Sequence, residues 1–391
     1  MAAVGIVCEY NPFHLGHEKQ LRMARELLGG NTPVVCLMSG NFVQRGAPAL
    51  FDKTVRARAA VECGASLVLE LPVTCALSSA EGFARGAVEI FDRLGAVDTL
   101  CFGSETGDAA ALVRAGEAMT APAFTQALRL ALTDGLSYPA ARQRALEETL
   151  GDGALLTSPN DILAAEYCKA LFERRSRSRI RPLAVRREGG YHDETPDAEN
   201  PSATAVRASL LRGESWRQLV PEAAAAVYDG AVRYTLASGE RAVLARLRGM
   251  PEAEWAQLPF GSEGLWSKLR RAVQTEHSVE EILCTAKSKR YPRTRLQRML
   301  MCGYLGITQT DLARPLTYVR VLAFDERGRA LLRRMRQSAA ISVINAGERP
   351  ADAAYYALEC RCAALYGLFA ESDTETLCVR EEALRIFRMQ A

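Results

Sequence analysis

The sequence has few of the residues that build metal sites or disulfide frameworks. Only four of its 391 residues are histidine, and its eleven cysteines include no CxxC pair; the closest two, Cys360 and Cys362, form a CxC. Zinc sites and disulfide-stapled folds need more ligands at shorter spacings. We therefore expect reduced, buried cysteines and no resident metal ion.

Long apolar runs and targeting signals are also missing. No run reaches the ~18 apolar residues that a membrane-spanning helix needs, and the first residues lack the basic, apolar and cleavage-site succession of a signal peptide. We expect a cytoplasmic protein with no membrane segment. The content of 48% hydrophobic and 24% charged residues is typical of a globular chain, and 391 residues predict two or three domains.

Short apolar runs alternate with helical patterns in the first ~120 residues. The runs are nearly continuous, as in strands buried on both faces, and cover residues 2–10, 33–39, 66–72 and 97–104. The helical pattern after the third run starts with a capping box, Ser78 and Glu81. This alternation predicts an α/β fold with a Rossmann-like, doubly wound parallel sheet.

The pattern changes further along the chain. Residues 120–175 are mainly helical, with a helix start at Ser158 and Pro159, and a fifth strand and a short helix are expected at 180–187 and 202–213. Composition then places a boundary near residue 213. We predict a catalytic domain over 1–213 and a mainly helical region over 214–391, with a small α/β part whose strands are 317–325 and 339–346 and a helical end of ~40 residues.

The turn after the first apolar run contains two of the four histidines, as "NPFHLGH". Ligands of open parallel sheets bind beyond the carboxyl ends of the strands, where this turn lies. Gly16 lets a helix begin close to a ligand, and the free N–H groups of that helix attract an anion. His14 and His17 are spaced to face one phosphate, where imidazole can stabilise developing charge. The alternatives are that both are cap residues, or that they bind zinc, for which only His192 and His277 remain as further ligands.

A wider set of motifs resembles the tRNA(Met) cytidine acetate ligase family, within the H-x-G-H nucleotidylyltransferase superfamily. The matching segments are "GIVCEYNPFHLGH", "MSGNFVQRGAPA", "LELP", "FGSE", "SPNDILAAEY", "GYHD", "SATAVR" and "KRYPRTRLQR", in the order expected and over nearly the whole chain. Two departures are small. Ala47 stands where an acidic residue is expected, and Pro292 where threonine is expected.

The resemblance implies an ATP-dependent ligase. Acetate and ATP would give acetyl-adenylate and pyrophosphate, and the acetyl group would pass to N4 of the wobble cytidine in the anticodon of elongator tRNA(Met). The implied partners are therefore acetate and tRNA, and ATP is the nucleotide, expected with Mg²⁺. The sequence names no Mg²⁺ ligands, since a metal held mainly by phosphates needs few from the protein.

The resemblance also assigns site residues. His14 and His17 would be catalytic, and Gln44 and Arg45 would bind acetate or cytosine. Between Arg186 and Arg187, spacing favours Arg186 for a contact with phosphate or ribose. The expected ATP-binding residues are Val7, Cys8, Glu9, Tyr10, Asn11, Pro12, Phe13, His14, Leu15, Gly16, His17, Glu18, Lys19, Gln20, Gly103, Asn160, Arg186, Arg187, Ser202, Thr204 and Arg207.

A basic segment at 287–298 predicts the RNA contact. It holds six cations and no acid, whereas a solvated helix face normally mixes charges. Phosphate contacts explain such a segment, and a tyrosine within it could stack on a base. The residues expected to bind tRNA are Lys287, Lys289, Arg290, Tyr291, Arg293, Arg295 and Arg298.

Two other functions share parts of this pattern. An adenylyltransferase that acts on a small cofactor precursor would also contain H-x-G-H and the serine, threonine and arginine of "SATAVR". It would leave about 175 further residues and the basic segment unexplained. An RNA-binding protein with an inactive nucleotide fold is the third possibility, and the intact His14, His17 and Arg207 disfavour it.

Overall fold

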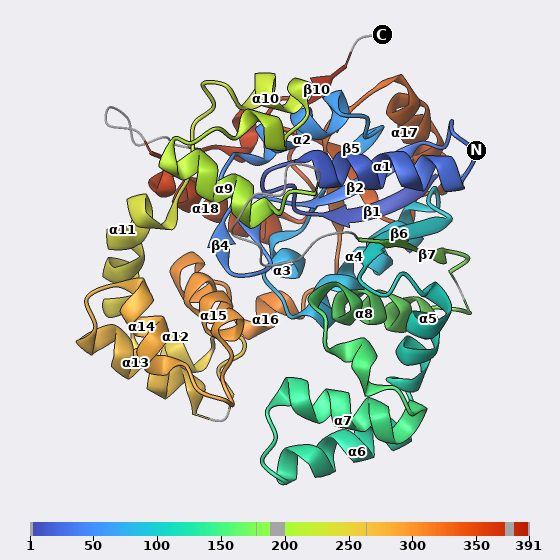
Figure 1. Cartoon of the computed structure of the whole chain (residues 1–391). Helices are drawn as coiled ribbons and strands as arrows, with labels where there is room; N and C mark the ends of the chain where they lie inside the picture. Colours follow the sequence, from blue (N-terminus) through green and yellow to red (C-terminus); the bar gives the residue numbers. More distant parts are fainter. Residues whose placement is uncertain (1–2, 177, 188–199, 263, 372–378, 390–391) are drawn as a thin grey trace.

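The structure is a computed structural model and describes residues 3–176, 178–187, 200–262, 264–371 and 379–389. Its centre is a twisted sheet (Figure 1). The N-terminal strands are β1 (Val4–Cys8), β2 (Val34–Ser39), β5 (Leu67–Leu71), β6 (Thr99–Ser104) and β7 (Arg181–Arg186). They lie in the order β5-β2-β1-β6-β7, all parallel. This is the doubly wound order of a Rossmann-like fold, and it confirms the predicted fold class and all five strands.

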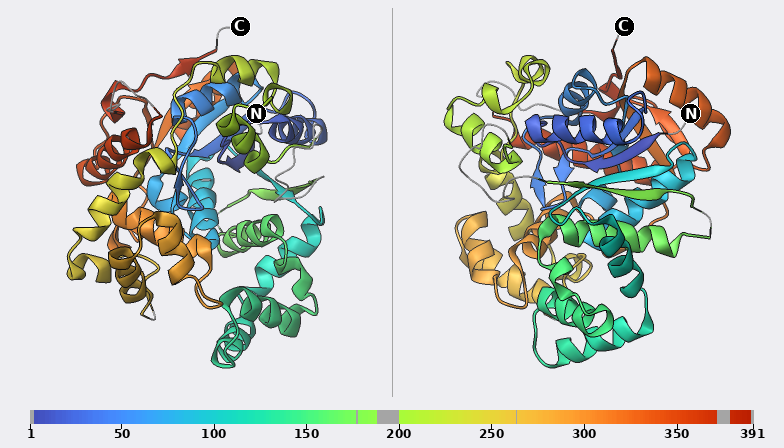
Figure 2. Two further views of the ribbon diagram at one scale, coloured as in Figure 1. Left: turned by 60° about the vertical axis from the view of Figure 1, so that its left-hand side comes forward. Right: turned by 45° about the vertical axis from the view of Figure 1, so that its right-hand side comes forward.

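Helices cover both faces of this sheet (Figures 1 and 2). One face carries α1 (Leu15–Leu27), α2 (Lys53–Glu62), α9 (Ala203–Arg212) and α10 (Glu222–Tyr228). The other carries α4 (Ala80–Leu94), α5 (Ala109–Ala118), α8 (Pro159–Glu173) and α17 (Glu326–Ser338). Helices α6 (Pro122–Thr133) and α7 (Tyr138–Leu150) extend away from the sheet beyond α5 and α8 (Figure 1). Both faces of the central strands are therefore buried, which explains their continuous apolar runs.

The C-terminal strands extend the same sheet. Strand β8 (Tyr318–Phe324) pairs antiparallel with β5, and β9 (Ser342–Asn345) and β10 (Phe387–Arg388) pair parallel with β8. The predicted strands at 317–325 and 339–346 are thus confirmed. The small α/β part belongs to the N-terminal sheet, although composition changes near residue 213.

A third apolar core lies among the C-terminal helices. It is built from α11 (Leu236–Arg248), α12 (Glu252–Ala256), α13 (Leu265–Thr275), α14 (Val279–Ala286), α15 (Arg293–Leu305) and α18 (Ala353–Tyr366), with the short α3 (Val73–Ala76) and α16 (Gln309–Leu312) beside it. Trp255 is fully buried there. The last ~40 residues were expected to be helical, but the last α-helix of the described residues ends at Tyr366. The described residues beyond it form two short 3₁₀ turns and β10.

Helix ends mostly follow the predicted signals. Ser158 and Pro159 start α8, and Ser202 and Gly213 bound α9. The predicted capping box at Ser78 is wrong by one residue, because Ser79 Oγ accepts the N–H of Gly82 at 3.2 Å and Ser78 instead bonds to the Ser79 carbonyl. The cysteines at described positions form no disulfide. No helix among the described residues is both long and apolar enough to cross a bilayer.

Buried charges join the C-terminal segment to the N-terminal sheet. Lys53 Nζ lies 2.7 Å from Glu70 Oε1 and 2.6 Å from Glu381 Oε1. Arg320, on β8, lies 3.0 Å from Glu359 and 3.5 Å from both Glu70 and Glu381. All five side chains are at least nine-tenths buried. Sequence reasoning missed this cluster, whose members lie on elements far apart in the chain.

Candidate nucleotide and RNA site

The two histidines form the start of α1. His14 is its N-cap, and His14 Nδ1 accepts the N–H of Gly16 at 3.1 Å. His17 Nδ1 accepts the N–H of His14 at 3.3 Å, and the ring centroids are 3.7 Å apart. Because each Nδ1 accepts a hydrogen bond, the ring proton of each neutral histidine lies on Nε2. Both histidines therefore cap α1, as one of the two alternatives for them predicted. Each still has an Nε2–H group that can donate to a ligand.

Burial and neighbouring cations keep both rings neutral. Burial, with Arg187 and Arg207, lowers the pKa of His14 to about 3. Burial, His14 and Arg187 lower the pKa of His17 well below its usual value. Neutral imidazoles can donate hydrogen bonds at physiological pH without themselves carrying charge.

A second helix start lies beside the first. Ser202 Oγ accepts the N–H of Ala205 at 3.0 Å and caps α9. A Cβ added at Gly16 would lie 3.7 Å from the Pro201 carbonyl, so the starts of α1 and α9 are close together. Arg207 reaches across from α9, donating to the Asn11 carbonyl at 2.6 Å and to Thr204 Oγ1 at 3.1 Å. Two helix N-termini and an arginine make this corner favourable for anions.

The turn before α1 is fixed from several sides. Asn11 Oδ1 accepts the N–H of Leu50 at 2.7 Å, and the Phe13 N–H donates to the Tyr228 hydroxyl at 2.8 Å. Arg56 is fully buried and donates to the carbonyls of Phe51, Glu9, Ser39 and Gly40. Sequence reasoning missed both Arg56 and Tyr228. A basic residue inside the apolar pattern of α2 was the available signal for Arg56.

Hydrogen bonds join the end of β6 to the start of α8 and to Arg187 after β7. Asn160 Nδ2 donates to Glu105 Oε1 at 2.7 Å, and Asn160 Oδ1 accepts from Arg187 Nη1 at 3.3 Å. Asp161 is buried and accepts from the Ser104 hydroxyl and from the Glu105 and Thr106 N–H groups. The carboxylates of Glu105 and Asp161 thereby hold the two loops together. Both lie in quoted motifs but had no predicted role.

The structure separates the two candidate arginines. A Cβ added at Gly103 would lie 2.9 Å from Arg187 Cδ, whereas a Cβ at Gly107 would lie 2.9 Å from Arg186 Cβ. Of these two arginines, only Arg187 contributes to the lowered pKa values of the histidines. The geometry favours Arg187 over Arg186, which spacing had favoured. The "GYHD" motif and His192 lie outside the described residues.

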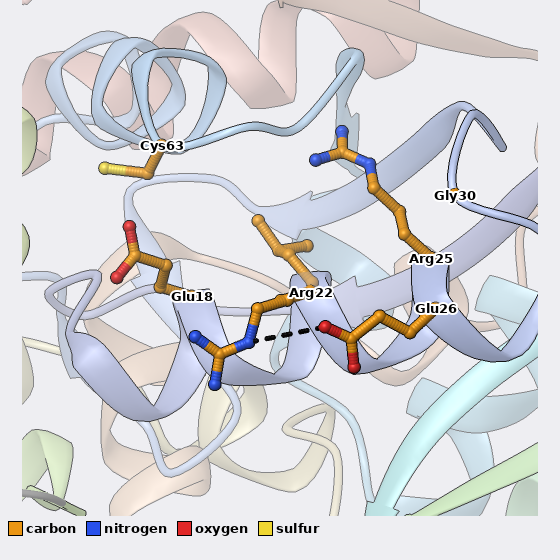
Figure 3. Close-up of a pocket in the computed structure, with 7 residues that line it drawn as sticks. Glu18, Arg22, Arg25, Glu26, Gly30 and Cys63 are labelled. Atoms are coloured by element: carbon orange, nitrogen blue, oxygen red, sulfur yellow. Dashed lines mark ion pairs between the residues drawn. The ribbon is translucent and has the colours of Figure 1, made fainter.

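Not every residue of the 7–20 segment faces this corner. Val7 and Cys8 belong to β1, the Tyr10 hydroxyl contacts Cys36 Sγ, and Gln20 faces Cys101 on β6. Lys19 Nζ contacts Asn200 Oδ1 at 3.4 Å. Glu18 lines a groove of about 490 Å³ between α1 and the end of α2, with Arg22, Glu26 and Cys63 (Figure 3). Neither histidine lines that groove, so Glu18 points away from the phosphate corner.

The segment "MSGNFVQRGAPA" forms a hairpin of β3 (Phe42–Val43) and β4 (Ala47–Pro48), with Gln44 and Arg45 at its turn. The Gln44 N–H donates to Glu9 Oε1 at 2.7 Å, next to the nucleotide turn. A Cβ added at Gly46 would lie 2.5 Å from the backbone of α15. The hairpin therefore connects the first turn to the helix that carries the basic segment.

The basic segment divides into an exposed and an anchored part. Lys287, Lys289 and Arg290 are exposed before α15. Arg293 bonds Glu280, and Arg295 bonds the Phe260 carbonyl and Ser262 Oγ, each at 2.9 Å. Arg298 is largely buried, which lowers its pKa to about 10, and it reaches the Gln44 carbonyl at 3.5 Å. Tyr291 packs between Lys268 and Arg295.

Comparisons with known proteins show the family to which the chain belongs. Residues 1–380 match the family model described as HIGH Nucleotidyl Transferase, and the chain belongs to this class. The tRNA(Met) cytidine acetate ligase of Clostridium perfringens is 36% identical over 375 residues, covering 88% of this chain and 90% of its own. That of Syntrophotalea carbinolica is 41% identical over 351 residues, covering 85% and 82%. Within the class, the chain is therefore a member of the tRNA(Met) cytidine acetate ligase family.

Two solved structures match the fold of this chain over its full length. Thermotoga maritima TmcAL in its apo form I has a TM-score of 0.91 at 28% identity, with complete coverage of both chains. TmcAL bound with alpha-thio ATP, form II, has a TM-score of 0.89 with the same identity and coverage. The predicted family is thereby confirmed.

Proposed function

We propose that the protein acetylates tRNA in an ATP-dependent reaction. Acetate and ATP give acetyl-adenylate and pyrophosphate, and the acetyl group passes to N4 of the wobble cytidine of elongator tRNA(Met), forming N4-acetylcytidine. The observation that carries the proposal is the pair of neutral histidines with free Nε2 donors between two helix N-termini. The names of the relatives support this reaction over one on a small cofactor precursor.

The first step needs alignment and charge neutralisation. An acetate oxygen attacks the α-phosphorus, and pyrophosphate leaves with the bonding electron pair. No covalent enzyme nucleophile takes part. The His14 and His17 Nε2–H groups donate to phosphate oxygens, and Arg187 and Arg207 offset the growing negative charge. Gly103 leaves room for the nucleotide beside Arg187.

Magnesium would arrive with the nucleotide. Among the described residues, no group of three or more histidine, cysteine, aspartate or glutamate side chains could hold a metal ion. Mg²⁺ that binds ATP is held mainly by phosphates and water. It would neutralise phosphate charge, and no residue of the described chain is assigned to it.

The hairpin turn is proposed as the pocket for acetate and cytosine. Gln44 and Arg45 lie there, between the first turn and α15. The basic segment begins on the same side, which supports a path for the anticodon loop from Lys287–Arg290 to the hairpin. We propose that residues 1–213 hold the ATP site and that the main tRNA-binding residues lie within 214–391, although β8, β9 and β10 of that part belong to the N-terminal sheet.

Replacing Lys287 and Lys289 together by alanine should weaken tRNA binding. Both side chains are exposed, so each can contact a phosphate. We expect a loss of about 3–10-fold, and a fall of about 1–2 in the slope of log affinity against log salt concentration. Filter binding at several salt concentrations measures both. Arg144→Ala, a surface change on α7, serves as the control and should preserve affinity and slope; an equal loss in the control would refute the assignment.

The Gly103→Ala variant should bind ATP less well. Its methyl group would lie 2.9 Å from Arg187 Cδ and 3.0 Å from Cγ, and would displace the side chain that faces the histidines. We expect the KM for ATP to rise by about tenfold or more, corresponding to about 1.4 kcal/mol. The control is Gly249→Ala, where the nearest atom would be 3.4 Å away. An unchanged KM in Gly103→Ala would show that Arg187 has no part in nucleotide binding.

Mass analysis of nucleosides tests the function itself. Purified tRNA is incubated with the protein, ATP and labelled acetate, then digested. Labelled N4-acetylcytidine that depends on ATP and occurs only in tRNA(Met) is the expected result. Label that never reaches RNA, while a small acceptor is adenylylated, would establish the alternative activity.

A further inference from the structure

Glu9 lies between the two parts of the proposed site. It follows β1 directly, and its Oε1 accepts the Gln44 N–H of the hairpin turn at 2.7 Å. Its own carbonyl accepts from Arg56 Nη1 at 2.5 Å, so the backbone is held as well. The carboxylate is thus fixed where the nucleotide turn meets the proposed pocket for acetate and cytosine. Glu9 is among the residues expected to bind ATP, but an ionised carboxylate repels phosphate, so we assign it no contact with the phosphates.

The surroundings of Glu9 make it a stronger base than an exposed glutamate. Burial raises its pKa above the usual value, whereas the Gln44 N–H and the charges of Arg207, Arg56 and Arg45 limit the rise. A higher pKa brings a general base closer to the working pH.

Tyr167 on α8 adds a second indication of a ligand. It is 3% exposed, and its hydroxyl has no hydrogen-bond partner among the described residues. Burial and the nearby Cys8 and Glu9 raise its pKa, so it stays a protonated donor. Burying a hydroxyl without a hydrogen-bond partner costs free energy, and a polar ligand atom that accepted its hydrogen bond would remove this cost.

The second step of the proposed reaction needs a proton acceptor. The lone pair of the cytosine amino group is delocalised into the ring, so the group attacks poorly until it can lose a proton. The histidines cannot serve, because their Nδ1 atoms already accept hydrogen bonds and their Nε2 atoms carry protons. Glu9 Oε2 makes no hydrogen bond to another described residue.

We propose that Glu9 is the general base of acetyl transfer, an assignment that rests on the proposed function. As the N4 nitrogen attacks the acetyl carbon, an N–C bond forms and the anhydride C–O bond breaks. AMP leaves with the bonding electron pair, and the N4 proton passes to Glu9 Oε2. The proton is released to water after the products leave, and the ionised carboxylate is restored.

The test supplies chemically prepared acetyl-adenylate with tRNA, so that ATP activation is bypassed. The single-turnover rate of Glu9→Gln, which can still accept the Gln44 N–H, should be about 10²–10⁴-fold below that of the unaltered protein. The unaltered protein should transfer faster as pH rises through the pKa of Glu9, and Glu9→Gln should lack this rise. Glu9→Asp should keep the rise at a reduced rate. The charged groups that face Glu9 are Arg207, Arg56 and Arg45. Burial raises the pKa of both Tyr167 and Cys8, so these two facing groups stay protonated in this range.

The matched control is Glu26→Gln, an exposed carboxylate at the other end of α1 that pairs with Arg22 at 3.8 Å. Figure 3 shows this pair. It should transfer at the unaltered rate. Transfer by Glu9→Gln at the unaltered rate, or with the same pH dependence, would overturn the role of Glu9 alone. If the unaltered protein does not acetylate tRNA from acetyl-adenylate, the proposed function fails and this role fails with it. Should Glu9→Gln not fold, the pH profile of Glu9→Asp decides.

Discussion

The His17→Ala variant should lose acetate-dependent exchange of pyrophosphate into ATP by at least about 10²–10³-fold. His17 Nε2 carries the proton because Nδ1 accepts the His14 N–H, so alanine removes a donor aimed at the phosphates. It also leaves the His14 N–H without its acceptor at the start of α1. The lowered pKa of His17 means that the effect should be similar across neutral pH, since the ring is neutral throughout.

His277→Ala is the control, because His277 is exposed and lies in the helical region. It should retain full exchange. Thermal unfolding of both variants checks that the loss in His17→Ala is not a loss of fold. Exchange by His17→Ala within a few-fold of the unaltered protein would mean that the imidazole does not stabilise the displacement at phosphorus.

The Lys53→Met variant should lose about 3–5 kcal/mol of unfolding free energy. Lys53 holds both Glu70 and Glu381, and methionine would leave three buried carboxylates with Arg320 as their only cation in the cluster. Burial opposes the charge of Lys53, but Glu381 and Glu70 raise its pKa above the usual value. Urea unfolding monitored by circular dichroism gives the free energy.

The pH dependence of the unfolding free energy gives a second test of the buried charges around Lys53. Burial, Glu70 and Glu381 already raise the pKa of Glu359 to about 7. Without Lys53, the buried carboxylates should bind more protons in the native state than in the unfolded state. The loss of unfolding free energy in Lys53→Met should therefore become smaller as the pH falls. Arg58→Met, on the same helix, breaks a pair with Glu62 near the surface and a cation–π contact with Phe387, and should cost under about 1 kcal/mol. Equal losses in the two variants would rule out a special role for the buried cluster.

Local sequence patterns were sufficient to predict the N-terminal strands of the sheet. The continuous apolar runs predict the parallel strands that the structure contains, and the H-x-G-H turn after the first of them predicts a phosphate-binding corner at the start of α1. Spacing alone could not decide between Arg186 and Arg187, because Arg186 ends β7, Arg187 follows it, and the sequence does not say how the chain turns there.

Long-range pairings were not visible in the sequence. Strand β8 reads as an ordinary strand, but nothing local indicates that it joins β5 antiparallel. A charge inside an apolar run was the available signal for the buried cluster, at Glu70 in "LVLEL" and Arg320 in "YVRVLAF". Lys53, which pairs with Glu70 and Glu381, begins α2, and Glu381 comes from a short 3₁₀ segment. Only the tertiary structure brings these four residues together.

A crystal structure with a non-hydrolysable ATP analogue tests the central claim most directly. The account predicts phosphate oxygens within hydrogen-bond distance of His14 Nε2 and His17 Nε2, between the starts of α1 and α9, with Arg207 and Arg187 beside them. A nucleotide bound in the groove of Glu18, Arg22 and Cys63, or anywhere that leaves both histidines without phosphate contact, would contradict it.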